Sequence, residues 1–321
     1  MRYFVTGGAG FIGSNYVEHL FKKVEGVTGI TIYDKFTYAS SPKNYIDFTE
    51  DSRLTIVKGD IGDSFFLEKS MAGHDVVVHF AAESHVDRSI HDATAFIQTN
   101  VLGTFNVLEA SRKTGVRTVI HVSTDEVYGS LSSGSADENH LLAPNSPYAA
   151  SKASSDLLAR SYFVTHGLDV RITRCCNNYG KHQFPEKVIP VFINKLKAGE
   201  KIPIYGNGTN IREWIHVSDH AMAIQVVLQK GNPGEIYNIG TGVHLSNNEL
   251  ADELIKLMNL GENMKSYVPD RKGHDLRYSI DSNKIESLGF EASIKFHDGL
   301  KQTIEWFQSN PEWWDLESKF C

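Results

Sequence analysis

Thr6-Gly7-Gly8-Ala9-Gly10-Phe11-Ile12-Gly13 follows a short apolar run and opens a helical pattern at residues 12–23. Its glycines fit two spacings at once, Gly7/Gly10/Gly13 and Gly8/Gly10/Gly13. Glycine permits a tight turn and lets a pyrophosphate approach the backbone, where the helix N-terminus offers unpaired N–H groups. A glycine-rich match alone is weak, because a plain tight turn also explains it. The strand before it and the helix after it favour a dinucleotide site.

The chain on either side alternates short, β-branched apolar runs with helical patterns. This alternation predicts an α/β fold with a Rossmann-type, doubly wound parallel sheet, in which ligands bind beyond the carboxyl ends of the strands. The expected strands are residues 3–6, 30–34, 54–58, 76–80, 118–123 and 170–174, and the expected helices are residues 12–23, 93–114 and 147–166.

The regular alternation stops near residue 174, which predicts a smaller C-terminal α/β substrate lobe. Expected strands there are residues 202–205, 214–217 and 236–239, and expected helices are residues 187–197, 219–228, 247–258 and 297–307. We therefore expect a Rossmann-type NAD-binding domain at residues 1–174. Residues 175–321 should form mainly the substrate lobe, with segments that can return to the first domain. No Pro/Gly-rich linker separates the two, so the pocket should lie between them.

Bulk composition narrows the classes of partner. The chain has 321 residues and a net charge of 32 − 39 = −7, which gives no support for a nucleic-acid or membrane-surface partner. No apolar run approaches the length of a membrane span. The cysteines, Cys175, Cys176 and Cys321, form no disulfide framework and lack metal-ligand spacing. We expect a cytoplasmic protein without a metal.

Acidic and small residues at strand ends refine the cofactor prediction. Asp34 ends the second expected strand, about 20 residues after the glycine stretch, where a carboxylate accepts from the ribose hydroxyls and repels a 2′-phosphate. NAD is therefore favoured over NADP, although the adjacent Lys35 can blur the preference. Asp60, after the third strand, can bind the adenine amino group or cap a turn. Ala81 and Ala82 allow backbone to approach the cofactor closely.

Tyr148 and Lys152 are one helical turn apart and share a helix face. A nearby ammonium and an oxidised nicotinamide both favour the phenolate of a tyrosine, whose pKa is otherwise about 10. Tyr148 can then take a proton from a sugar hydroxyl while the carbon beneath is oxidised. The spacing is common by chance, and a surface pair is the alternative. Its place after the strand pattern favours catalysis.

Thr124, Asp125 and Glu126 stand at the carboxyl end of the fifth expected strand. Strand residues alternate faces, so both carboxyls serve one pocket only if the strand has ended and the chain bends. Crowded carboxyls raise one pKa and leave an acid beside a base. Oxidation at C4 of a hexose acidifies C5–H, so Glu126 can remove that proton, Asp125 can protonate the departing C6 hydroxyl, and Thr124 can hydrogen-bond the C4 oxygen. The alternative is a helix cap or solvated loop acids.

These residues stand within longer motifs, and with them the chain resembles the dTDP-glucose 4,6-dehydratases of the extended short-chain dehydrogenase/reductase superfamily. The resemblance runs nearly end to end. Its more specific stretches are His79–Ser89, Ser123–Gly129, Arg174–Gly180, Gln183–Lys187, Pro203–Gly206, Arg212–Trp214 and Asp270–Tyr278.

The resemblance implies a full set of site residues. The catalytic residues would be Thr124, Asp125, Glu126, Tyr148 and Lys152. NAD would be bound by Gly7, Gly10, Phe11, Ile12, Gly13, Asp34, Lys35, Thr37, Asp60, Ile61, Ala81, Ala82, Ser84, Thr99, Ser123, Tyr148, Lys152 and Asn178. Glucose would be held by Ser84, Asn177, Glu186 and Lys187. The thymidine and diphosphate would be held by Pro203, Tyr205, Arg212, Asn247, Arg271, His274 and Tyr278. For each arginine alone, a surface salt bridge is an even alternative.

The chain departs from the family pattern at a few loop positions. Lys181 and Lys272 replace a usual proline, Cys176 replaces a usual serine, and residues 40–42 replace an Ala/Gly-Asn pattern. These changes bear on local loop shape and cofactor fit.

The expected reaction is conversion of dTDP-glucose to dTDP-4-keto-6-deoxyglucose by an NAD-dependent hydro-lyase. One alternative is a nucleotide-sugar 4-epimerase, which needs the Tyr-Lys pair without the acid pair. Others are a 4,6-dehydratase for another nucleotide hexose and a non-catalytic dinucleotide sensor. The resemblance also implies a homodimer, built on the long helical patterns at residues 93–114 and 147–166, although buried internal helices would show the same apolar content.

Overall fold

Seven parallel strands form the central sheet in the order β10-β6-β5-β4-β1-β2-β3. The computed structural model describes residues 1–311, 313 and 314, so Cys321 and the end of the predicted second lobe lie outside the described residues. The strands are β1 (Arg2–Thr6), β2 (Gly29–Asp34), β3 (Leu54–Lys58), β4 (Val76–His79), β5 (Thr118–Thr124), β6 (Val170–Cys175) and β10 (Ile236–Ile239). Each neighbouring pair is parallel. The Rossmann-type doubly wound sheet is confirmed, with its strand order reversing between β1 and β4.

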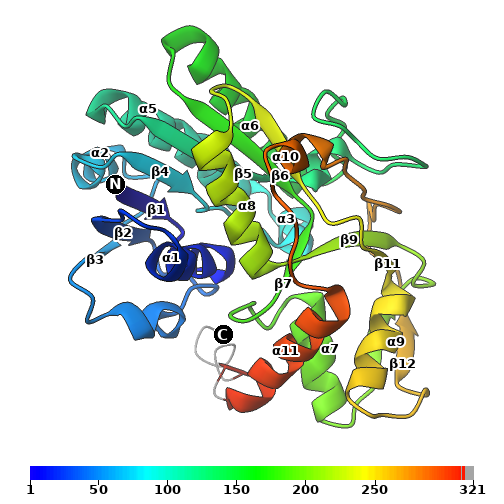
Figure 1. Cartoon of the computed structure of the whole chain (residues 1–321). Coiled ribbons are helices and arrows are strands. Elements are labelled where there is room, and N and C mark those ends of the chain that lie inside the picture. Colours follow the sequence, from blue (N-terminus) through cyan, green and yellow to red (C-terminus); the bar gives the residue numbers. More distant parts are fainter. Residues whose placement is uncertain (312, 315–321) are drawn as a thin grey trace.

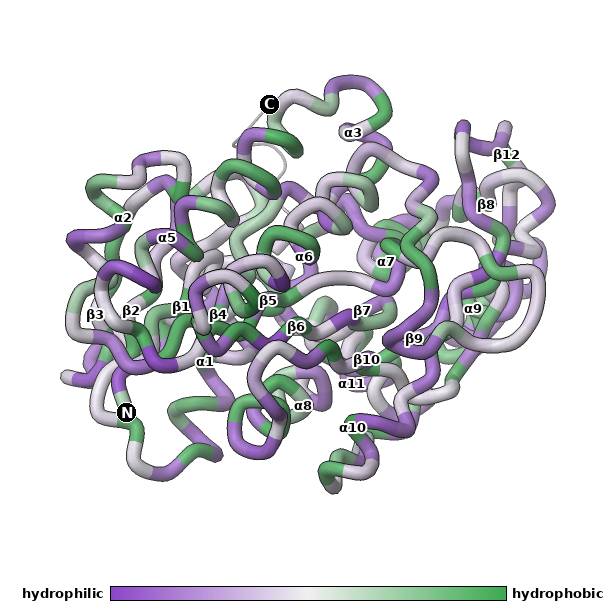
Figure 2. Tube along the Cα trace, turned by 90° about the horizontal axis from the view of Figure 1, so that it is seen from above, coloured by the Kyte–Doolittle hydropathy of each residue, from purple (hydrophilic) through white to green (hydrophobic). Residues whose placement is uncertain are grey.

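Helices cover both faces of this sheet because its strands are apolar on both sides (Figures 1 and 2). One face packs against α1 (Phe11–Lys23) and α8 (Val217–Lys230), and its core includes Val5. The other face packs against α2 (Ser64–Met71), α5 (Thr104–Thr114) and α6 (Pro147–His166), and its core includes Phe4. Successive residues of β1 thus point to opposite cores, as strand geometry requires.

The helix expected at residues 93–114 is a continuous helical run of three segments. It consists of α4 (Thr94–Phe96), a π-helix η2 (Ile97–Gly103) and α5. Within the π-helix, Asn100 accepts a hydrogen bond from Glu83 N at 2.8 Å and donates to Glu83 O at 3.0 Å and Ser151 Oγ at 2.8 Å. The π-helix therefore ties the loop after β4 to α6.

A smaller lobe packs around its own apolar core at one end of the molecule (Figure 1). Its helices are α7 (Val188–Lys197), α9 (Asn247–Leu257) and α11 (Phe296–Ser309). Its strands are β7 (Asn177–Tyr179), β9 (Ile211–His216) and β11 (His244–Ser246) in one sheet, and β8 (Ile202–Tyr205) with β12 (Lys265–Val268) in another. Elsewhere in the chain, the short helices are η1 (Pro42–Phe48), α3 (Val86–His91), η3 (Asp125–Tyr128) and α10 (Asn283–Ser287).

The chain leaves the large sheet after β6 and returns to it. After β7, β8 and β9 it forms α8, which packs on α1, and β10, which pairs with β6 at the edge of the sheet. Segments of the second half thus complete the first core, while the division at residue 174 stays a prediction. In the described part of the chain, no helix has the length and apolar character to cross a membrane.

Candidate active site

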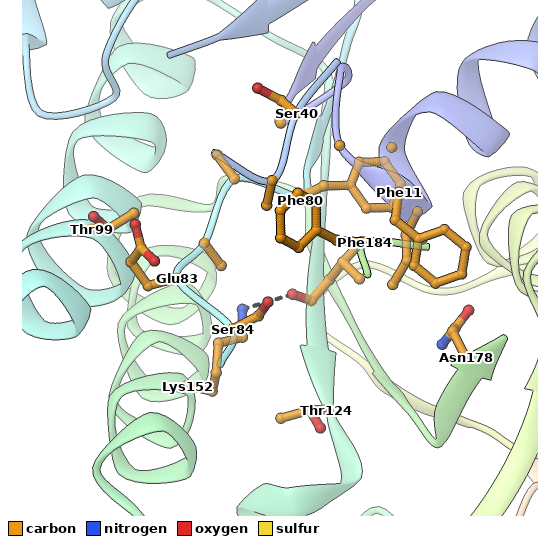
Figure 3. Close-up of a pocket in the computed structure, with 18 of the residues that line it drawn as sticks. Phe11, Ser40, Phe80, Glu83, Ser84, Thr99, Thr124, Lys152, Asn178 and Phe184 are labelled. Carbon is orange, nitrogen blue, oxygen red and sulfur yellow. Dashed lines mark hydrogen bonds between the residues drawn. The ribbon is translucent and has the colours of Figure 1, made fainter. Parts of the chain in front are cut away.

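A cleft opens beyond the carboxyl ends of β1, β2, β4, β5 and β6. Every residue that the sequence predicted to bind the cofactor lines it, and so do the five predicted catalytic residues. In Figure 3, Thr124 extends from β5 and Lys152 from α6 beside it, while the rings of Phe11, Phe80 and Phe184 gather on another side. The predicted residues thus converge on one cavity, although their individual roles stay predictions.

The glycine loop brings the N-terminus of α1 against this cleft. Gly7 has a φ of +67°, and a Cβ there would lie 2.7 Å from Ala81 N; a Cβ on Gly13 would collide with Gly7 O. Gly10 is the N-cap and provides no side-chain cap. The first N–H groups of α1 therefore have no partner within the helix and face an open cradle suited to an anion.

Asp34 sits at the end of β2 and is 7% exposed. Burial raises the pKa of its carboxyl, while the N–H groups of Phe36 and Ala9, which donate to Oδ1 at 2.8 Å and Oδ2 at 3.0 Å, oppose the rise. Each carboxylate oxygen keeps a free lone pair. The side chain therefore braces the glycine loop and still has acceptor capacity for a ribose.

Residues 40–42, where the sequence differs from the family pattern, pack against the glycine loop. Ser41 N donates to Ala9 O at 3.2 Å, and Ser41 Oγ caps η1 by accepting from Lys43 N. Beyond it, Lys35 pairs with Asp60 at 2.7 Å at the rim of the cleft. Despite its different sequence, the segment at residues 40–42 therefore still contacts the glycine loop through Ala9.

The acid pair lies where the strand turns into a short helix. β5 ends at Thr124, the 3₁₀-helix η3 begins at Asp125, and Gly129 follows with a φ of +74°. This bend lets Asp125 and Glu126 line the same cleft, which periodic alternation would forbid. Both side chains thus face the space between β5 and α6 rather than bulk solvent.

The two carboxyls have different surroundings. Burial raises the pKa of Asp125 far above its ordinary value, with further contributions from the charges of Glu126 and Glu213, and Asp125 Oδ2 has no hydrogen-bond partner. Burial also raises the pKa of Glu126, but the positive charges of Arg212, Arg271 and Lys187 oppose it. An acid and a base are thereby separated by their environment.

Tyr148 and Lys152 are both buried on α6. Lys152 Nζ donates to Val122 O at 2.8 Å, and burial lowers its pKa to about 8. Burial and the charge of Glu126 raise the pKa of Tyr148, although a hydrogen bond with Thr124 lowers it. These surroundings therefore hold the phenol protonated, and its ionisation depends on positive charge from the Lys152 ammonium and from an oxidised nicotinamide.

The four residues predicted to hold the hexose line the same cleft as the acid pair: Ser84, Asn177, Glu186 and Lys187. Lys187 Nζ donates to Ser84 O at 3.0 Å. Glu186 accepts from Arg88 at 3.1 Å and from Tyr38 OH at 3.3 Å. The second lobe therefore contributes both charged side chains to the cleft through the residues just before α7.

The seven residues predicted to hold the nucleotide do not line this cavity; they are Pro203, Tyr205, Arg212, Asn247, Arg271, His274 and Tyr278. Three of them lie beside it. The charges of Arg212 and Arg271 act on Glu126, and the Arg212 guanidinium stacks 4.2 Å from the ring centre of Tyr278. Arg271 Nε is buried without a partner, which suits an anionic ligand.

Three of the others are on β8 and at the start of α9, both in the small lobe. Pro203 and Tyr205 are on β8, and Tyr205 meets His274 edge to face at 6.2 Å between ring centres. Asn247 begins α9 and donates its N–H to Asn210 O at 3.1 Å. These residues flank the arginines without forming one cavity with the acid pair.

The sequence reasoning missed a thiol and an imidazole in the cleft. Cys175, Cys176 and His220 all line it. Asn178 Nδ2 donates to Cys175 Sγ at 3.3 Å, and its Oδ1 lies 2.8 Å from His220 Nδ1. Because an amide oxygen only accepts, His220 Nδ1 must be the donor. His220 comes from α8, where the chain returns to the large sheet, so no local spacing indicated it.

Comparisons with known proteins agree with this arrangement. A model of the family described as GDP-mannose 4,6 dehydratase matches residues 4–303. The dTDP-glucose 4,6-dehydratase of Streptomyces antibioticus is 50% identical over 320 residues, which cover 98% of this chain and 95% of that protein. The chain belongs to the dTDP-glucose 4,6-dehydratase family.

Solved structures place the fold in the same family. The crystal structure of DesIV, a dTDP-glucose 4,6-dehydratase from Streptomyces venezuelae with NAD bound, is 51% identical and has a TM-score of 0.96, covering 98% of this chain and 99% of that one. A UDP-glucose 4-epimerase from Thermotoga maritima is 29% identical with a TM-score of 0.89, covering 97% of this chain and 100% of that one. The epimerase shares the scaffold, whereas the dehydratases share half of the sequence.

Proposed function

We propose that this chain converts dTDP-glucose to dTDP-4-keto-6-deoxyglucose in deoxysugar biosynthesis, using NAD that is regenerated in each turnover. The observation that carries the proposal is the acid pair beside Tyr148. Asp125 and Glu126 line the same cleft as Tyr148 and Lys152, and an epimerase has no need for two such carboxyls. The half-identical dehydratases support the same reading.

The cleft fits NAD. The uncapped N-terminus of α1 suits a pyrophosphate, and the backbone of Gly7 and Ala81 leaves no room for a Cβ between them. Asp34 would accept from the adenosine ribose and would repel a 2′-phosphate. When bound, NAD accepts hydride from C4 of the hexose and returns it to C6.

We assign the first proton transfer to Tyr148. Its oxygen would take the proton of the C4 hydroxyl, while Thr124 Oγ1 would donate a hydrogen bond to the C4 oxygen. Lys152 would stabilise the phenolate electrostatically. General acid–base catalysis of this kind contributes about 10² to 10⁴ in rate, so we expect Tyr148→Phe to lower turnover by about 10³.

We assign the elimination of water to the acid pair. Once C4 is a ketone, the carbanion at C5 is an enolate, and Glu126 Oε would remove the C5 proton. Asp125, kept protonated by burial, would pass its proton to the departing C6 hydroxyl. The basic surroundings of Glu126 and the unpaired Oδ2 of Asp125 support this division of roles.

We propose that the nucleotide binds in the second lobe. Arg212 and Arg271 would pair with the diphosphate, because guanidinium groups bind phosphate oxygens in bidentate fashion. Tyr205 and His274 would border the thymine. The buried, partnerless Nε of Arg271 supports an anion at this place.

A product assay tests the function. The purified protein is incubated with dTDP-, UDP-, CDP- and GDP-hexoses, and the products are identified by mass spectrometry. We expect dTDP-glucose to lose one water, with deuterium placed at C4 reappearing at C6. A product of unchanged mass would indicate an epimerase, and water loss from another nucleotide hexose would reassign the substrate.

We further propose that the protein is a homodimer in a reducing compartment such as the cytoplasm. Neighbouring helices α6, η2 and α5 carry exposed apolar side chains, among them Leu102, Leu157 and Val164 at 55%, 59% and 63% exposure. Such a surface suits a second copy of the same chain. Cys175 and Cys176 are free thiols, which supports the compartment.

A further inference from the structure

Three polar side chains lie along one face of α6, four residues apart. Tyr148 and Lys152 line the cleft, and Asp156 lies one helical turn beyond Lys152. Asp156 is 2% exposed and does not line the cleft. A carboxylate so deeply buried is costly unless it is paired, so its partners indicate what it does.

Asp156 is fixed by side chains of the strands beneath it. Arg174 Nε, on β6, donates to Asp156 Oδ2 at 2.9 Å, and His121 Nε2, on β5, lies 3.3 Å from Oδ1. Arg174 is itself held, because its Nη1 donates to Tyr128 OH at 2.9 Å. All of these side chains are buried. The negative charge of Asp156 is therefore immobile and directly behind the reacting pair.

Lys152 has few other partners. Its ammonium donates to the neutral carbonyl of Val122 at 2.8 Å. Burial lowers the pKa of Lys152 to about 8, and the charge of Asp156 opposes this decrease. The charge of Lys152 acts on His79 on β4 and His121 on β5, and Tyr148 lies one helical turn before it on α6.

None of these other groups supplies a negative charge when the phenol is protonated. Burial lowers the pKa of both histidines, and the charge of Lys152 lowers both further, so the imidazoles are neutral at neutral pH. Arg174 is positive. The carboxyls of Asp125 and Glu126 face Tyr148 from the cleft side and act on its pKa. Asp156 is thus the negative group on the Lys152 side.

We propose that Asp156 is a positioning residue that, one helical turn away on the same face of α6, keeps the Lys152 ammonium charged for its role beside Tyr148. This inference rests on the proposed roles of Tyr148 and Lys152, and it extends that pair to a line of three residues. Arg174 then holds the carboxylate in place through its hydrogen bond to Oδ2. The line covers the first half of α6 and runs from the substrate cleft at Tyr148 into the core at Asp156.

The pH dependence of turnover tests this role. Lys152 is charged below its pKa, so activity of the wild type should fall as pH rises through about 8. Asp156→Asn removes the charge that opposes burial, and the fall should begin about 1 to 3 pH units lower, the range expected for losing one nearby opposite charge. Asp156→Glu keeps the charge on the same helix face and should keep the fall near its wild-type pH.

The same series of variants needs a control for folding. Asp156→Asn leaves Arg174 buried without its partner and can destabilise the protein, so thermal unfolding is measured for each variant. The double variant Asp156→Asn/Arg174→Met leaves no orphan charge. Because Lys152 responds to Asp156, the double variant should also lose activity at lower pH than the wild type.

The outcomes separate this inference from the proposed function. The positioning role is overturned if Asp156→Asn or the double variant folds but loses activity at the same alkaline pH as the wild type. An equal shift in Asp156→Glu overturns it too, because packing and not charge would then be responsible. If the wild type turns over no nucleotide hexose, the proposed function fails first, and the inference fails with it.

Discussion

At the scale of single residues, the cleft works by placing similar groups in unlike surroundings. Asp125 and Glu126 are neighbours in sequence, yet one faces buried carboxyls and a thiol while the other faces two arginines and a lysine. Cys175, at the end of β6, and Cys176, directly after it, are likewise adjacent residues whose thiols have different surroundings. Differences of this kind are visible only when the fold brings distant charges together.

We predict that Asp125→Asn stabilises the protein at neutral and alkaline pH. Burial raises the pKa of Asp125, so the folded state binds a proton that the unfolded state has released. Stability from this group is therefore full below the unfolded pKa of about 3.9 and is lost as pH rises toward the folded value. Asparagine resembles the protonated acid and avoids this loss, so Asp125→Asn should raise the free energy of unfolding by about 1 to 3 kcal/mol.

Thermal or chemical unfolding from pH 4 to 9 measures the effect. The exposed Asp47→Asn is the matched control, because it makes the same chemical change at the surface. The difference between Asp125→Asn and the wild type should grow with pH and that of the control should not. A constant difference would contradict a raised pKa for Asp125.

We also predict that the two adjacent thiols react differently. Burial raises the pKa of Cys175, but the neighbouring Cys176 and His220 and the hydrogen bond from Asn178 outweigh it, so that the pKa falls to about 6. Burial and Cys175 raise the pKa of Cys176. The thiolate is the nucleophile. Iodoacetamide should therefore label Cys175 at neutral pH, more slowly when NAD is added.

Peptide mass spectrometry locates the label. The rate at Cys175 should rise through about pH 6 and then level, while Cys176 stays unlabelled over the same range. Cys175→Ser is the control and should abolish the labelling of this peptide. Preferential labelling of Cys176 would show that the hydrogen-bond assignment is wrong.

At the scale of elements, the glycine loop and α1 decide whether a dinucleotide can be held. Gly13 lies in the first turn of α1, where a Cβ would overlap Gly7 O. We predict that Gly13→Ala destabilises the protein by about 1 to 3 kcal/mol, as overpacking does, and weakens NAD binding at least tenfold. Calorimetric titration and thermal unfolding measure the two effects.

Gly261→Ala is the matched control for this substitution. Gly261 has no positive φ, and a Cβ there would have no atom within 4 Å. The control should bind NAD like the wild type and unfold within about 0.5 kcal/mol of it. If both variants behaved alike, close backbone approach would not be what the glycine loop provides.

The large elements were predictable from periodicity because they are long and have a clear burial pattern. The strand expected at 30–34 is observed at Gly29–Asp34, and the helix expected at 147–166 is observed with the same bounds. The strands β7 and β11 were missed because they have three residues each, and β12 was missed because its sequence Lys-Ser-Tyr-Val has no apolar run. The start of β9 was placed three residues too late, because the charged residues Arg212 and Glu213 interrupt its apolar pattern.

The candidate site was predictable where it follows the strand ends of the first half. Residues such as Asp34 and Glu126 occupy strand ends whose order the doubly wound topology determines. His220 and Asp156 were not predicted as partners of the site, because both act through tertiary contacts. Nothing in a local pattern indicates that α8 returns to the large sheet or that Arg174 lies under Asp156.

At the scale of the whole molecule, the helices α6, η2 and α5 expose apolar side chains such as Leu102 and Val164. We predict a dimer of about twice the 35.8 kDa chain mass by light scattering. Leu157→Lys, on α6, should shift the protein toward monomer, because a charge would be buried in the interface. Leu141→Lys is the control, since Leu141 is 84% exposed but lies outside these helices. A monomeric wild type, or dimers unaffected by Leu157→Lys, would contradict this interface.

We propose that one cleft carries two separable sets of groups, Tyr148 for oxidation at C4 and the acid pair for loss of water. Single-turnover absorbance of the reduced cofactor tests it most directly. With dTDP-glucose, Tyr148→Phe should give no signal, whereas Asp125→Asn and Glu126→Gln should accumulate reduced cofactor that decays slowly. Carboxyl variants that release the dehydrated product at the wild-type rate, or that never reduce the cofactor, would contradict the account.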